Sequence, residues 1–170
     1  EGTDALVDAD WVRTIFANFT HLLRNSIDHG IEIPAERGAK DPQGRIAFRC
    51  REATNCWVFR LEDDGRGIDE AALVRAAITR GLISQELADA LDSAARLQLM
   101  FVDGVSTRHD VSEISGRGFG APAFLQSVTE RGGRLTIASS PGLGTIFEIH
   151  VPFPNQHAGG EGQSKDPVFA

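Results

Sequence analysis

The sequence predicts an α+β fold, a two-layer sandwich in which helices cover one face of a mostly antiparallel sheet. The first observation behind this is a long helical period near the N-terminus. The second is the order of the later segments, because strand-like runs come in two adjacent pairs with helical stretches between them. Strands joined by short turns pair antiparallel, and the helices then bury their apolar sides on one face of the sheet.

The 170 residues, 41% of them hydrophobic and 24% charged, fit one soluble globular domain. We expect this domain to cover residues 1–153, and the polar, glycine-containing residues 154–170 to form a disordered tail or linker. The chain has no apolar run of 18 residues, which predicts no membrane span in it, and its start without Met suggests a fragment. The formal charge of −7 argues against binding to nucleic acid.

The secondary structure is read from apolar periods and from turn residues. A first helix is expected to begin after Asp8 or Asp10 and to end at Gly30, followed by a surface loop over 32–44. Strands are expected at 45–50, 56–61, 134–138 and 145–151. Further helices are expected at 69–80, 84–100 and 118–131, with a mobile segment at 102–117. Cys50 and Cys56 have no metal-site spacing, so reduced thiols are expected.

The first helix carries a polar face. His21, Asn25, Asp28 and His29 recur at i, i+4, i+7 and i+8, so their side chains share one stripe. An Asn oxygen is a suitable ligand for Mg²⁺, which takes few protein ligands and completes its shell with water and phosphates. The stripe therefore indicates either the floor of a nucleotide site or an ordinary solvated face.

A glycine-rich turn, DDGRGIDE, follows the second expected strand. Asp63 could accept a hydrogen bond from the amine of adenine, while Gly65 and Gly67 would let a ring approach the backbone. The alternative is a common surface turn. Asp64 and Asp69 are expected to be a solvent-facing residue and a helix cap.

Two more glycine-rich turns suggest phosphate and base contacts. GRGFG precedes a helix, where amide N–H groups suit phosphate oxygens, and GLGT opens the last strand with a hydroxyl, although it also fits a plain hairpin loop. A dinucleotide-binding fingerprint is excluded because HDVSEIS, not a strand, precedes GRGFG. Neither a P-loop nor the set of protein-kinase motifs is present.

Five ordered stretches together carry a resemblance to a known family. HLLRNSIDHG, DDGRGID, LMFVDGVST, SGRGFG and GLGT resemble the N, G1, F, G2 and final Gly-Thr boxes of the GHKL (Bergerat-fold) ATPase superfamily. Within it, the chain is most similar to the ATP-binding catalytic domain of CheA-type chemotaxis histidine kinases, over about residues 1–154. The resemblance implies the Bergerat sandwich with a flexible ATP lid.

The resemblance also implies roles for residues. Asn25 is expected to bind Mg²⁺, His21 to orient the reacting phosphate, and Asp63 to read adenine. Further nucleotide-binding positions are implied at Arg24, Asp28, His29, Lys40, Gly65, Gly67, Phe101, Ser106, Thr107, Arg108, Gly116, Arg117, Gly118, Phe119, Gly120 and Thr145. The lid departs from the usual pattern at Val105, Arg108 and Ala121-Pro122.

The activity implied is transfer of the γ-phosphoryl group of ATP, with Mg²⁺, to a His on a separate phosphoacceptor domain. The phosphoryl group would then pass to a response regulator, with a receptor-coupling protein as a possible further partner. The resemblance implies a cytoplasmic domain that is monomeric when isolated. Two alternatives stay open, a non-catalytic ATP-binding regulatory module and an ATP hydrolase; His21 disfavours the second, because a carboxylate is the commoner activator of water.

Overall fold

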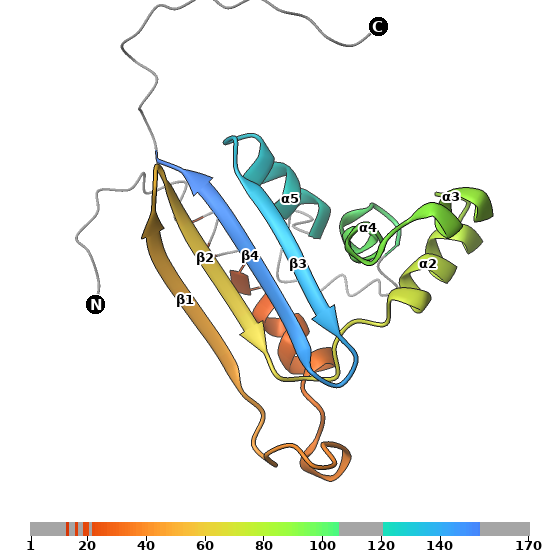
Figure 1. The fold of residues 1–170 in the computed structure, drawn as a ribbon, viewed down its shortest axis with the longest axis horizontal. Coiled ribbons are helices and arrows are strands. Elements are labelled where there is room, and N and C mark those ends of the chain that lie inside the picture. Colours follow the sequence, from red (N-terminus) through yellow and green to blue (C-terminus); the bar gives the residue numbers. More distant parts are fainter. Residues whose placement is uncertain (1–12, 14–15, 17–18, 21, 106–120, 154–170) are drawn as a thin grey trace, which may run out of the picture.

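The computed structural model of the chain describes residues 13, 16, 19–20, 22–105 and 121–153. Four strands form one antiparallel sheet in the order β1-β2-β4-β3. Their bounds are β1 (Ile46–Ala53), β2 (Cys56–Asp63), β3 (Arg134–Ser140) and β4 (Gly144–Pro152). In Figure 1 the described helices lie behind this sheet and beyond its β3 edge, and none of them lies in front of it, so the two-layer α+β prediction is confirmed.

The helices are short. The described residues of the first helix lead directly into η1 (Ser26–Gly30), a single π-helical turn. The others are η2 (Pro34–Glu36), α2 (Glu70–Thr79), α3 (Gln85–Ala90), α4 (Ser93–Gln98), η3 (Leu99–Phe101) and α5 (Ala121–Thr129). Among the described residues, no helix has both the length and the apolar character needed to cross a membrane.

The helix expected over residues 84–100 is wrong as one element. Leu91 is extended, with a ψ of 132°, and the side chain of Asp92 accepts a hydrogen bond from the backbone N–H of Ala95. Asp92 therefore starts a new helix, since a short acidic side chain satisfies a free N–H group better at an N-cap than inside a helix. The same geometry at Asp69 caps α2, as expected.

The core lies between the sheet and the helices. Phe59 and Leu61 of β2 alternate with the outward Arg60 and Glu62, as a strand with one buried face requires. Other members of the same cluster are Phe19, Leu22, Leu97, Phe101, Phe124, Val128, Leu135, Ile137, Phe147, Ile149 and Val151. The first helix is thereby held against the sheet by its apolar side, and its polar side takes no part in this core.

Candidate functional site

The carboxylate of Asp63 is the buried centre of a polar cluster at the end of β2. The residue is only 5% exposed. Its Oδ1 accepts hydrogen bonds from the backbone N–H groups of Gly65 at 3.0 Å and Thr145 at 3.2 Å, and its Oδ2 accepts one from the hydroxyl of Ser26 at 2.8 Å. A carboxylate has about four acceptor positions, so these three donors leave about one for a further partner.

Ser26 joins the first helix to this cluster at the π-helical turn. The residue is buried, and its hydroxyl spans 37 positions of sequence to reach Asp63. The N–H of Ile31 bonds to the carbonyl of Ser26 at 2.7 Å and closes the wide turn. π-helical turns are rare and often occur at functional sites. Sequence reasoning missed Ser26, although its place directly after Asn25 was a usable signal.

Two glycines let three chain segments approach closely here. A Cβ on Gly65 would lie 2.2 Å from the carbonyl oxygen of Gly30, and one on Gly144 would lie 1.9 Å from the carbonyl oxygen of Asp63. Gly144 also has a φ of 104°, which other residues rarely adopt. The predicted glycines of the first and third turns thus serve close packing of backbone against backbone.

Thr145 contributes more than its backbone N–H. It is buried, and its hydroxyl lies 3.2 Å from that of Ser139 on β3. Ser139 also accepts a hydrogen bond from the N–H of Ile68 at 2.8 Å, which ties the turn after Asp63 to the sheet. No pattern in the sequence pointed to Ser139.

The polar face of the first helix is open by comparison. Asn25 is half-buried, whereas Arg24, Asp28 and His29 are exposed. Asn25 immediately precedes Ser26, so the expected metal ligand and the Asp63 cluster are neighbours on one helix end. His21 lies outside the described residues.

The other sequence-predicted residues are not all brought together. Phe101 is buried in the hydrophobic core, and Gly67, with a φ of 78°, packs against the carbonyl group of Ser140. Lys40 is bound in a network of ion pairs and hydrogen bonds next to the turn that follows Asp63. Residues 106–120 lie outside the described part of the chain, and with them Ser106, Thr107, Arg108, Gly116, Arg117, Gly118, Phe119 and Gly120. Val105, a departure from the family pattern, is fully buried beside Ala77 and Leu99.

Asp64 corrects an expectation. It is not simply solvent-facing, because its carboxylate accepts hydrogen bonds from Arg37 at 2.8 Å and from the backbone N–H of Arg45 at 2.9 Å. Burial alone would raise the pKa of Asp64, but these two donors together lower it below its ordinary value. Arg37 is itself 3% exposed and was missed, since it lies in a segment that composition marks as a surface loop.

These residues fit an adenine nucleotide with magnesium. Asp63 is a buried acceptor with capacity for an amine donor, whereas the space on the side-chain side of Gly65 is filled by the carbonyl group of Gly30 and does not admit a ring at that point. Asn25 offers one oxygen ligand, and the described residues contain no group of three or more His, Cys, Asp or Glu side chains that could hold a metal. A single protein ligand suits Mg²⁺, which is completed by phosphates and water.

Comparison with known proteins assigns the family. The profile described as "Histidine kinase-, DNA gyrase B-, and HSP90-like ATPase" matches residues 8–155, and the chain belongs to this family of ATP-binding domains. A solved histidine kinase domain from the Erythrobacter litoralis EL346 blue-light activated histidine kinase has the same fold. Its TM-score is 0.50 at 18% identity, covering 88% of this chain and 52% of that one.

Curated relatives have more similar sequences. The gliding motility regulatory protein of Myxococcus xanthus is 39% identical over 89% of this chain. The chemotaxis protein CheA is 33% identical in Bacillus subtilis and 36% in Cereibacter sphaeroides, again over 89% of this chain. The chain spans only 20%, 23% and 22% of the lengths of these three relatives.

Proposed function

We propose that this chain is the Mg-ATP-binding catalytic domain of a CheA-like histidine kinase, and that it passes the γ-phosphoryl group of ATP to a His on a separate phosphoacceptor domain. The observation that carries the proposal is the buried Asp63 carboxylate, held by Ser26, Gly65 and Thr145 with one acceptor position left. The similarity to chemotaxis kinases over 89% of the chain supports the reaction class.

In this proposal the buried and exposed parts of the site have separate tasks. Asp63 accepts a hydrogen bond from the adenine amine and fixes the base. Asn25 binds the magnesium ion, and Arg24 and His29 interact with the phosphates from the exposed helix face. His21 orients the reacting phosphate, and the glycines at 116, 118 and 120 form the base of a lid. Bound magnesium would neutralise charge on the phosphates.

This division suits phosphoryl transfer to an imidazole. Such transfer depends mainly on positioning and on charge neutralisation. The acceptor imidazole is largely neutral near pH 7, so the domain needs no strong base of its own. We further propose that the phosphoryl group passes next to a response regulator, and that a receptor-coupling protein is another partner. The proposed compartment is the cytoplasm, and the isolated domain is proposed to be a monomer.

The deciding experiment incubates the 170-residue chain with γ-labelled Mg-ATP and a histidine-bearing phosphoacceptor domain from a chemotaxis kinase. We expect the label to appear on the acceptor. Tight ATP binding without transfer would replace the proposal with a regulatory module. Release of labelled phosphate alone would replace it with an ATP hydrolase, and failure to bind ATP would reject all three functions.

A further inference from the structure

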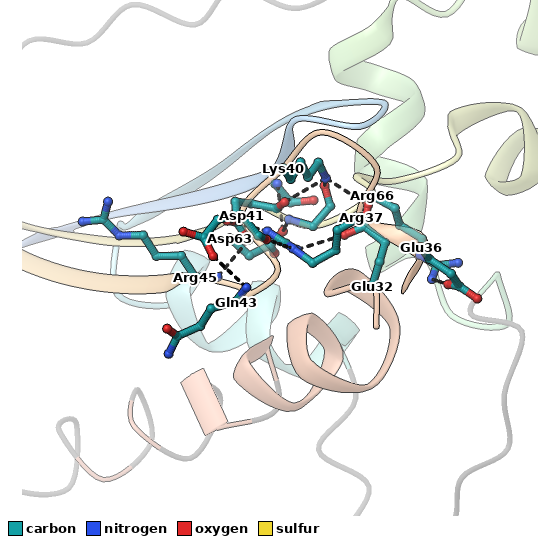
Figure 2. Close-up of polar contacts among 12 residues, drawn as sticks. Glu32, Glu36, Arg37, Lys40, Asp41, Gln43, Arg45, Asp63 and Arg66 are labelled. Atoms are coloured by element: carbon teal, nitrogen blue, oxygen red, sulfur yellow. Dashed lines mark hydrogen bonds and ion pairs between the residues drawn. The ribbon is translucent and has the colours of Figure 1, made fainter. Parts of the chain in front are cut away.

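Four charged side chains connect the loop after the first helix to the turn that follows Asp63. Glu32, Arg37 and Lys40 come from the loop, and Asp64 comes from the turn; Figure 2 shows the three loop residues gathered around this contact. Two cations face two carboxylates, so the group is electrically balanced. Such a group is costly to bury unless every member is hydrogen-bonded.

Arg37 is the buried member. Its side chain is 1% exposed and bonds to Glu32 Oε2 at 3.2 Å and to Asp64 Oδ2 at 2.8 Å. Its Nε donates to the carbonyl oxygen of Asp41. Two guanidinium nitrogens therefore bind within the loop, and the third connects the loop to the turn.

Lys40 acts on the backbone of the turn. Its ammonium group donates to Glu32 Oε1 at 2.9 Å, to the carbonyl oxygen of Asp64 at 2.9 Å and to that of Gly65 at 2.8 Å. An ammonium group has three N–H donors, and these three acceptors occupy all of them. To contact a phosphate, Lys40 would have to give up one of these bonds.

One peptide bond links Lys40 to the buried carboxylate. The Asp64–Gly65 peptide accepts from Lys40 at its carbonyl oxygen and donates from its N–H to Asp63 Oδ1 at 3.0 Å. A hydrogen bond at the carbonyl end of a peptide polarises it and strengthens donation at the N–H end. Lys40 and Asp63 therefore hold opposite ends of the same planar group.

We propose that Lys40 and Arg37 are positioning residues for base recognition, and that Lys40 does not bind phosphate. Lys40 holds the Asp64–Gly65 peptide directly and Arg37 holds the Asp64 side chain, and this peptide in turn holds the Asp63 carboxylate in place. This inference rests on the proposed function, because it needs adenine as the base that Asp63 recognises. It replaces the direct nucleotide-binding role that the family resemblance implied for Lys40.

The test measures the affinity of the chain for ATP, ADP and adenosine in the unaltered protein, Lys40→Met and Lys40→Arg. We expect both variants to lose at least about tenfold in affinity, the scale of one hydrogen bond to a charged group, and by the same factor for all three ligands. Lys40→Arg is informative because it keeps the charge but not the compact three-donor group. Arg45→Met is the matched control, since the exposed Arg45 side chain points away from the network (Figure 2).

Glu32→Gln separates the two roles by the sign of its effect. If Lys40 positions the turn, this variant weakens binding of adenosine and of ATP alike. If Lys40 binds phosphate, removal of the competing carboxylate strengthens ATP binding and leaves adenosine binding unchanged.

The inference would be overturned if Lys40→Met weakened the binding of ATP but not of adenosine. It would also be overturned if Lys40→Arg bound all three ligands as tightly as the unaltered protein. Thermal unfolding of each variant identifies any loss that comes from misfolding, and an unaltered chain that binds no ligand would reject the proposed function and the inference with it.

Discussion

The two halves of the proposed nucleotide site are built differently. Around Asp63, buried groups from the first helix, β2 and β4 are already joined by hydrogen bonds. On the helix face, Arg24, Asp28 and His29 are exposed. In the proposed function, this difference means that the base is recognised by fixed geometry, whereas the phosphates are recognised by cationic side chains on an exposed helix face.

The largest expected effect is on the stability of the charged network that supports the buried half of the site. Arg37→Met leaves Asp64, whose side chain is 40% exposed, without its cation and leaves Glu32 with Lys40 alone. We expect the free energy of unfolding to fall by about 3 kcal/mol, the lower end of the range for a broken buried pair. Denaturant unfolding measures this. Arg66→Met is the control, because the Arg66–Glu36 pair is more than half exposed and should contribute less than about 1 kcal/mol. Equal losses in both variants would show that the Arg37 network is no more important than a surface pair.

The next largest effect is on binding of the adenine base. Asp63→Asn exchanges an acceptor for a donor opposite the adenine amine, and we expect ATP binding to weaken by about 1.5–3 kcal/mol. The triphosphate of purine riboside, which lacks this amine, should lose much less. Calorimetric titration of both ligands makes the comparison, and unchanged ATP affinity would mean that Asp63 does not read the base.

Asn25→Ala probes the open half. We expect loss of the Mg²⁺-dependent part of ATP affinity, while adenosine binding changes by less than about twofold because adenosine carries no phosphates for a magnesium ion on Asn25 to bind. Titrations with and without Mg²⁺ provide the measurement. If adenosine affinity fell as far as Mg-ATP affinity, the two halves would not be separable in the way described here.

The smallest effect is on acid stability. The hydrogen bond from Lys40 is the largest cause that lowers the pKa of Glu32, and Asp64 also has a lowered pKa. A carboxylate whose pKa is lower in the folded state stabilises the fold above its unfolded pKa, and that stability is lost as the pH falls through the folded value. The free energy of unfolding should therefore decrease below about pH 4.5, and less steeply in Glu32→Gln. Identical slopes would exclude this contribution.

Much of the candidate site could be predicted because its backbone requirements are local. Asp63 and Gly65 belong to one turn, and Asp69 caps the helix that follows it. Contacts across the fold could not be predicted in the same way. Ser26 bonds to Asp63 over 37 positions, and no local period or turn rule connects two such residues.

The sequence by itself determined where the four strands, α2 and α5 fall along the chain, since alternation, helical period and glycine turns act over a few residues. It also determined the glycine-rich turns after β2 and before β4, which lie side by side in the fold. Only the tertiary structure decided that the loop at 31–45 is anchored by a buried Arg37, and that Lys40 is bound to the backbone of the turn. The physical reason is that the energetic contribution of a charged side chain depends on its burial and its partners, which are set by segments distant in sequence.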